Sequence, residues 1–171
     1  MNRNMKTRLS GILTKLSVGL AALILSFGAH ATDWNWTHGT SCHEEYENRI
    51  SSSTRNRFGW GLDFTQSSGT HNWIHCAVPT DGDSADTVRY VRLRFYTGSA
   101  DAWISQVHIY NGDTKVKSFS VNWKTGWYTK TLDLGTPLVF SKGLGISIEI
   151  KAGVEMMSHR FIFSGAGARF D

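Results

Sequence analysis

Polar and apolar residues alternate one by one along much of this chain, which is the pattern of half-buried β-strands rather than of helices. The clearest run is Thr87–Thr97, in which Val91, Leu93 and Phe95 alternate with tyrosines and arginines. A shift of one residue would bury those arginines, so the register of this strand is strongly specified. Further alternating runs predict the strands 57–66, 71–78, 103–110, 116–123, 128–134, 138–140, 145–151, 159–164 and 166–170.

The strands are short and are separated by clusters of Gly, Asn, Asp and Ser. No strand alternates with a long helical segment, which excludes a parallel α/β fold. The pattern therefore predicts an all-β fold, a two-sheet antiparallel β-sandwich of the jelly-roll or immunoglobulin-like type. Asn111-Gly112, between two alternating runs, predicts a tight hairpin whose two central residues have positive φ.

Two segments allow more specific structural predictions. A short helix is expected over residues 42–50, because a Ser-x-x-Glu capping-box pattern opens the segment and three apolar residues recur at every fourth position. In the expected strand 57–66, Trp60 is in phase with the other apolar side chains. It is therefore expected to lie in the core.

The first 31 residues have the features of a secretory signal peptide. Four cations accompany a 13-residue apolar run, Leu16–Gly28, and the segment ends in a small-x-small cleavage pattern, Ala29-His30-Ala31. As a helix this run is about 20 Å long, shorter than the roughly 30 Å core of a bilayer, so cleavage is favoured over retention as an anchor. We expect one mature domain, residues 32–171, that is secreted or periplasmic and has no membrane span after cleavage.

The net charge of the chain comes from the expected leader and not from the expected mature domain. Residues 1–31 hold four of the 18 Lys and Arg and none of the 14 acids, so the whole chain's net charge of +4 comes from the leader. The remaining residues carry equal numbers of both signs. No overall positive field is left to attract nucleic acid, and we expect none as a partner.

The chain has two cysteines, Cys42 and Cys76. In an oxidising compartment the simplest state is one disulfide. It would close a loop of about 35 residues and stabilise the fold by roughly 3–4 kcal/mol. The alternatives are free thiols and a tetrahedral zinc site that includes nearby histidines, although neither cysteine belongs to a Cys-x-x-Cys pair.

Catalytic motifs are weak in this sequence. It has neither the Gly-x-Ser-x-Gly nucleophile elbow nor the His-Glu-x-x-His pattern of zinc proteases. No cofactor is expected, except that the acidic loop 81–86 offers three aspartates as oxygen ligands for calcium. A small glycoside hydrolase remains an alternative if two carboxylates converge. The candidates are Asp63, Asp101, Asp133 and Glu149.

Aromatic residues suggest a ligand surface. All seven tryptophans lie beyond residue 31, and planar rings at loop tips stack on the faces of sugars. Trp34 and Trp36 alternate and are expected to cover one face of the first strand. The alternative for the loop rings is that they complete the core at one end of the sandwich. The candidate ligand-binding residues are Trp103, Trp123, Trp127 and Tyr128.

Arginines and tyrosines also form a stripe on the outer face of the 87–97 strand, with Arg89, Arg92 and Arg94. Such a stripe suits a protein or polyanion contact, or a solvated face whose arginines pair with acids such as Glu149. Residues 103–151 resemble exported sandwich-type binding modules in architecture. We expect an exported non-catalytic binding module whose ligand is a glycan. The alternative is an exported structural or protein-interaction protein, such as a surface component or an inhibitor.

Overall fold

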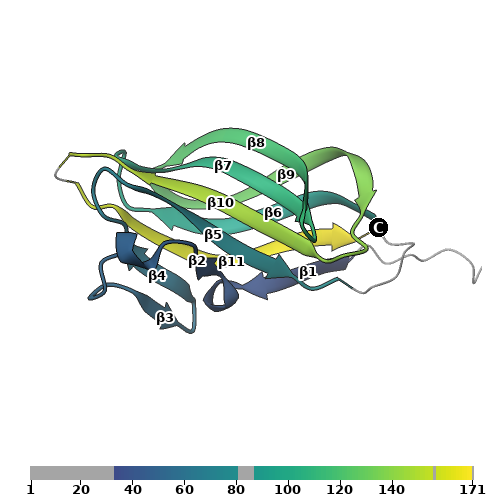
Figure 1. The fold of residues 1–171 in the computed structure, drawn as a ribbon, viewed down its shortest axis with the longest axis horizontal. Coiled ribbons are helices and arrows are strands. Elements are labelled where there is room, and N and C mark those ends of the chain that lie inside the picture. Colours follow the sequence, from purple (N-terminus) through teal and green to yellow (C-terminus); the bar gives the residue numbers. More distant parts are fainter. Residues whose placement is uncertain (1–32, 81–86, 156, 171) are drawn as a thin grey trace, which may run out of the picture. The chain divides into compact units, whose positions relative to one another are not determined.

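The computed structural model describes residues 33–80, 87–155 and 157–170. The expected signal peptide (1–31) and the acidic loop (81–86) lie outside the described residues. Strands dominate the described part, with two short 3₁₀ turns, η1 and η2 (Figure 1). In chain order the elements are β1 (Asp33–His38), η1 (Gly39–Ser41), β2 (His43–Glu44), η2 (Glu47–Arg49), β3 (Asn56–Phe58), β4 (Gly61–Thr65), β5 (His71–Val78), β6 (Thr87–Thr97), β7 (Ala102–Asn111), β8 (Thr114–Lys124), β9 (Gly126–Val139), β10 (Leu144–Ala152) and β11 (Arg160–Phe170).

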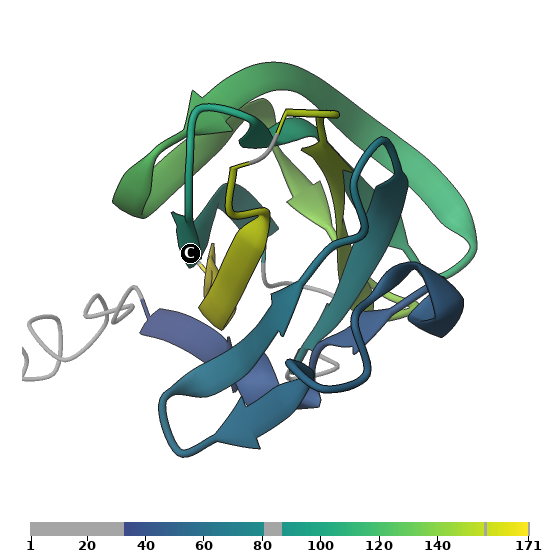
Figure 2. The same cartoon turned by 90° about the vertical axis from the view of Figure 1, so that its left-hand side faces the viewer.

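The strands form two antiparallel sheets that pack as a β-sandwich, which confirms the expected fold class (Figures 1 and 2). Sheet A has the order β3-β4-β11-β6-β9, and sheet B has the order β2-β5-β10-β7-β8. In sheet A, β4 pairs with residues 160–163 of β11, and β1 pairs with residues 165–170 of the same strand. The first strand therefore continues the sheet where β4 ends.

The connectivity is that of a jelly roll. From β4 to β7 each strand lies in the sheet opposite its predecessor, β7 and β8 form a hairpin within sheet B, and the crossing resumes from β8 to β11. The eight strands β4 to β11 thus make two four-stranded layers, which is the jelly-roll pattern. Of the two sandwich types that the alternation allowed, the jelly roll is the one that forms.

Alternate residues of the inner strands fill the space between the sheets. Six apolar residues at these positions of β6 and β10 are at most 1% exposed. Burial of each such side chain contributes roughly 1.5–3 kcal/mol. The alternation therefore gave the correct inner face for both strands. These residues are Val91, Leu93, Phe95, Ile146, Ile148 and Ile150.

The expected hairpin is confirmed, and its turn lies one residue later than expected. Asn111 pairs with Thr114, so Gly112 and Asp113 are the two central residues. Gly112 has a φ of 58°, and neither Asn111 nor Asp113 has a positive φ. A single positive φ at the first central position is the type II′ arrangement, which favours glycine there. The Asn111 side chain bonds instead to backbone at the end of β9 and in the loop after it.

The segment 57–66 is a hairpin and not one strand. Phe58 of β3 pairs with Gly61 of β4, so Gly59 and Trp60 form the turn. Trp60 is therefore not in the core: it is 44% exposed, and its ring stacks on that of Phe58 at 4.8 Å. Phe58 shares a face with Gly61, and Leu62 shares the opposite face with Arg57, so the apolar alternation that runs through the turn in the sequence does not lie on one face of the hairpin. Two other pairs of expected strands are continuous: 128–134 with 138–140 in β9, and 159–164 with 166–170 in β11.

The helix expected over residues 42–50 is wrong. His43–Glu44 forms β2, which pairs with β5, and only the single 3₁₀ turn Glu47–Arg49 follows. The cause is the side chain of Asn72 in β5. Its Oδ1 accepts from the N–H of Tyr46 and its Nδ2 donates to the carbonyl of Tyr46, each at 2.9 Å. These two bonds extend the sheet ladder past β2 and engage the backbone groups that a helix would use.

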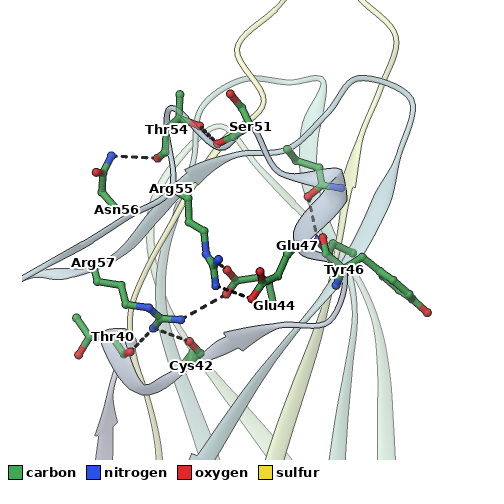
Figure 3. Close-up of polar contacts among 12 residues, drawn as sticks. Thr40, Cys42, Glu44, Tyr46, Glu47, Ser51, Thr54, Arg55, Asn56 and Arg57 are labelled. Atoms are coloured by element: carbon green, nitrogen blue, oxygen red, sulfur yellow. Dashed lines mark hydrogen bonds and ion pairs between the residues drawn. The ribbon is translucent and has the colours of Figure 1, made fainter.

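The expected disulfide between Cys42 and Cys76 is confirmed, so both sulfurs are unavailable to zinc. Beside it, β2 turns the fully buried carboxylate of Glu44 into the space between the sheets. Arg55 pairs with Glu44 Oε1, and Arg57 lies 3.5 Å from Oε2, both reaching in from the side of sheet A (Figure 3). Arg57 also donates to the Cys42 carbonyl at 3.0 Å. The disulfide and the ion pairs together close this edge of the sandwich.

Candidate functional site

Two of the four aromatic residues expected to bind a ligand turn inward. Trp123 at the end of β8 and Tyr128 at the start of β9 both pack on Phe95, with ring centroids 5.5 and 5.4 Å from it. The Tyr128 hydroxyl donates to the carbonyls of Lys124, at 2.6 Å, and Thr125, at 3.1 Å. The structure thus brings Trp123 and Tyr128 together at the edge of the core, where they fix the connection between β8 and β9.

The other two residues lie on the outer faces of different sheets. Trp103 of β7 belongs to sheet B and is half-buried, with the Lys124 Nζ 5.9 Å from its ring centroid. Trp127 of β9 belongs to sheet A, is 54% exposed and contacts the Tyr96 ring at 5.4 Å. Because the core lies between the sheets, Trp103 and Trp127 belong to separate surfaces.

Rings and arginines gather on the outer face of sheet A. Residues that pair directly across antiparallel strands point to the same face, and the register sets them in rows across β1, β11, β6 and β9. We call this surface the ring–arginine face. It consists of Trp34, Trp36, His38, Tyr90, Arg92, Arg94, Tyr96, Trp127, Thr129, Thr131, Asp133, Gly165, Gly167 and Arg169.

Trp36 lies against the sheet because the strand beneath it has glycines. It pairs with Gly167 of β11, where a Cβ would be only 2.7 Å from the ring atom Cδ2 of Trp36. A Cβ on Gly165 would be 3.6 Å from the Cε3 atom of the same ring. Trp34 stacks on Trp36 at 5.8 Å, and the Arg92 guanidinium covers Trp34 at 4.1 Å. The ring of Trp36 is thus held from below and from one side, while the residue remains 42% exposed.

Two shallow hollows on this face share Arg94 as a wall. The first has a volume of about 240 Å³ and the second about 100 Å³. Both are smaller than the roughly 300–1,000 Å³ of pockets that enclose a small molecule, so they suit contact with parts of a larger ligand. The first is lined by Trp36, Thr37, His38, Arg94, Ser164 and Gly165, and the second by Arg94, Trp127, Tyr128 and Thr129.

Arg94 differs from its neighbours in having an unengaged guanidinium: among the described residues no acceptor, carboxylate or ring contacts it. Arg92 donates from Nε to the Thr131 hydroxyl at 2.9 Å. Arg89 forms a bidentate pair with Asp133, with both distances 3.1 Å. The hydrogen bond from Arg89 is the main cause that holds the pKa of Asp133 below its ordinary value, so Asp133 is a carboxylate at neutral pH and is already paired.

The four carboxylates considered for a hydrolase each have a different partner. Asp63 and Asp133 lie in β4 and β9, which are separated by two strands of sheet A, and Glu149 lies in sheet B. The expected pairing of the β6 arginines with Glu149 is therefore wrong, because β6 belongs to sheet A. The observed pairs are Asp63 with Arg160, Asp101 with His159, Asp133 with Arg89, and Glu149 with Ser105.

Within the described ranges, no three His, Cys, Asp or Glu side chains are grouped so that they could hold a metal ion. The calcium hypothesis concerns residues 81–86, which fall outside those ranges. None of the described segments is a helix with the length and hydropathy of a membrane span.

Sequence reasoning did not place Trp36 beside Arg94. The two residues come together because β1 and β6 flank β11, a pairing between distant parts of the chain. One signal was present: Gly165-x-Gly167 leaves two positions of one strand face without side chains, and the ring of Trp36 lies over both. Only the pairing of β1 with β11 shows that these glycines accommodate that ring.

By sequence, the chain matches no known protein family and no curated protein. By structure, it is similar to the low-affinity xylan-binding module CBM86 of Roseburia intestinalis, with 10% identity over 81% of this chain and 96% of that one and a TM-score of 0.49. It is also similar to a family 35 carbohydrate-binding module of Clostridium thermocellum, with 10% identity over 79% of this chain and 97% of that one and a TM-score of 0.48. The C-terminal CBM6 of the laminarinase LamC of Zobellia galactanivorans is similar with 11% identity over 80% of this chain and 99% of that one and a TM-score of 0.47.

Proposed function

We propose that this domain is an exported, non-catalytic carbohydrate-binding module and that the ring–arginine face contacts the glycan. The observation that carries this proposal is a pair of tryptophans, Trp36 and Trp127, each more than 40% exposed and each lining a hollow that Arg94 shares. Large exposed apolar side chains on one surface mark a contact site. Tryptophan rings offer a flat apolar body that suits the apolar face of a sugar ring.

The spacing of the two tryptophans suits a chain of sugars. Trp36 aligns with Arg92 and Trp127 with Tyr96, so the two lie three strands and four residues apart in the sheet. Standard strand geometry puts their Cα atoms about 20 Å apart. Arg94 and Thr129 supply polar groups between the rings. The ligand that fits this surface is therefore an oligosaccharide or polysaccharide segment and not a single sugar.

The proposed site keeps Trp127 from the residues expected from the sequence; Tyr128 also borders the second hollow, but its ring packs inward on Phe95. The site adds Trp36 and Arg94. Trp103 is left out because it lies in the other sheet, and Trp123 because its ring packs on Phe95 inside the sandwich. The site is thus a sheet face and not a loop tip.

Export is part of the proposal and has two supports. The first 31 residues have the composition and cleavage pattern of a secretory leader. The disulfide between Cys42 and Cys76 is the kind of bond that persists in oxidising compartments. A secreted or periplasmic protein would meet glycans of the cell surface or the surroundings.

The test is retardation of the protein in gels that contain a panel of soluble polysaccharides. We expect at least one to retard the wild type, and Trp36→Ala or Trp127→Ala to weaken that binding about tenfold. Trp60→Ala is the matched control, because Trp60 is 44% exposed and lies outside the face. Both site variants should stay folded: Trp127→Ala should keep its unfolding midpoint, whereas Trp36→Ala should lose about 1–2 kcal/mol of stability, because its ring packs on β11.

Two outcomes would contradict the proposal. One is binding that survives both Trp36→Ala and Trp127→Ala in folded protein. The other is a panel in which no polysaccharide retards the wild type, which would favour the alternative of a protein partner. That alternative is tested by capture of envelope or surface proteins, with Arg92→Glu and Arg94→Glu as the variants that should lose the partner.

A further inference from the structure

We infer that the ring–arginine face selects acidic glycans, with Arg94 binding a carboxylate or sulfate group on a sugar. This rests on the proposed function and names its ligand class. The starting observation is that Arg94 is exposed and has no partner among the described residues, although it stands between two hollows lined by tryptophan. A guanidinium presents a planar fork of donors that matches a carboxylate or sulfate oxygen pair.

The charges around Arg94 favour an anion. Neither hollow has an acidic residue in its lining. The nearest acid of the face, Asp133, is two rows away along β9 and is already held by Arg89. Arg92 has only neutral partners, the Thr131 hydroxyl and the Trp34 ring, so its positive charge adds to that of Arg94. A ligand without negative charge would leave this field uncompensated.

The lining of the first hollow includes a second polar side chain, His38. The backbone N–H of Thr40 donates to Nδ1 of His38 at 3.3 Å, which makes Nδ1 an acceptor. In a neutral ring the proton is then on Nε2, and that nitrogen is a donor. His38 and Arg94 line the hollow together with Trp36. One wall thus suits the apolar face of a sugar, and the charged and polar groups suit an anionic substituent.

The shared position of Arg94 points to a polymer in which acidic units are frequent. A sugar in either hollow would bring its substituents to the same guanidinium, because Arg94 lines both. A chain with acidic groups at regular intervals can satisfy Arg94 in several registers. A neutral chain offers it only hydroxyl groups, which make weaker bonds to a cation than charged oxygens do.

The experiment compares polysaccharides that differ only in charge. Affinity electrophoresis or calorimetry would use homogalacturonan in its free-acid and methyl-esterified forms, neutral galactan, and a sulfated galactan. We expect the wild type to bind at least one acidic form about tenfold more tightly than its neutral counterpart, with binding that weakens as salt rises. The free-acid and sulfated arms distinguish the two possible anions.

Arg94→Gln should reduce binding of the acidic form to about the level of the neutral form, and it should weaken neutral binding much less, because a neutral chain makes only the weaker hydroxyl bonds to Arg94. Arg94→Lys should restore part of the preference, because it keeps the charge and loses the fork. Lys142→Gln, which removes one positive charge outside both hollow linings, is the matched control and should change nothing.

The outcomes separate the two proposals. Binding of neutral and esterified chains that depends on Trp36 and Trp127, with no gain for acidic chains or no effect of Arg94→Gln, would overturn the selectivity and keep the carbohydrate function. Absence of binding to every polysaccharide would overturn both. An acidic preference lost equally in Lys142→Gln would show that overall charge, and not Arg94, is responsible.

Discussion

The close packing of Trp36 on β11 predicts how a glycine substitution in β11 changes the stability of the protein. Gly167→Ala places a methyl group 2.7 Å from Trp36 Cδ2, 2.9 Å from Cε3 of the same ring and 2.9 Å from the carbonyl oxygen of Asn35. Contacts this short are not sustained, so the ring must lift away from the sheet or β1 must shift. Overpacking of this kind costs roughly 1–3 kcal/mol. Since Trp36 is at the surface and can move, we expect the free energy of unfolding to fall by about 1–2 kcal/mol.

Alanine at two other glycines should destabilise the protein less, which gives an expected order of stability losses. A Cβ on Gly165 would be 3.1 Å from the carbonyl oxygen of Thr37 and 3.6 Å from the Trp36 ring. A Cβ on Gly59, in the β3–β4 turn, would meet no atom within 4 Å. The loss of stability should therefore be largest for Gly167→Ala, smaller for Gly165→Ala and within about 0.5 kcal/mol of zero for Gly59→Ala.

The assay is urea denaturation followed by tryptophan fluorescence, with glycan binding measured on the same samples. Gly167→Ala should weaken glycan binding about as much as Trp36→Ala, because it displaces the same ring. Equal stabilities for the three glycine variants would refute the close packing of Trp36 on β11. Full glycan binding by folded Gly167→Ala would show that the position of Trp36 is not needed for the ligand.

Two further predictions concern the closed edge of the sandwich. Glu44→Gln removes a fully buried carboxylate from two arginines that are each about one-third exposed, and the free energy of unfolding should fall by about 1–3 kcal/mol. Glu47→Gln removes an exposed partner of Arg55 and should cost less than about 1 kcal/mol, so equal losses in the two variants would contradict the role given to Glu44. Reduction of the disulfide between Cys42 and Cys76 should lower the free energy of unfolding by roughly 3–4 kcal/mol, as measured by urea denaturation with and without a reductant. A change below 1 kcal/mol would show that the bond adds little to the fold.

The alternation of side chains was enough to predict the strands that cross the core. In β6 and β10 the inner residues are apolar except for Thr97 at the end of β6, and a shift of one residue would bury arginines or a lysine, so only one register is stable. The apolar pattern predicted the wrong element where a side chain makes the hydrogen bonds that a neighbouring strand's backbone would otherwise make. Around Tyr46 the apolar spacing fits a helix, but the amide of Asn72 bonds to both backbone groups of that residue and holds the segment extended.

The candidate site was only partly predictable, for a related reason. The position of Trp127 near a turn was visible in the sequence, and so was the arginine stripe, but whether the Trp127 ring faces solvent was left open. The inward turn of Trp123 and Tyr128 was not, because a ring at the end of a strand has the same sequence signature whether it faces solvent or Phe95. The assembly of Trp36, Arg94 and Trp127 on one surface depends on which strands are neighbours in sheet A, and that is a property of the fold.

The most direct test of the carbohydrate-binding claim is an NMR titration that follows the seven indole N–H signals, each assigned by substitution. The titrant is an oligosaccharide from whichever polysaccharide binds best. The signals of Trp36 and Trp127 should shift in a saturable way, while those of Trp60 and Trp103 stay in place. Shifts confined to Trp60 or Trp103, or no shift in any indole at saturating oligosaccharide, would contradict a glycan site on the outer face of sheet A.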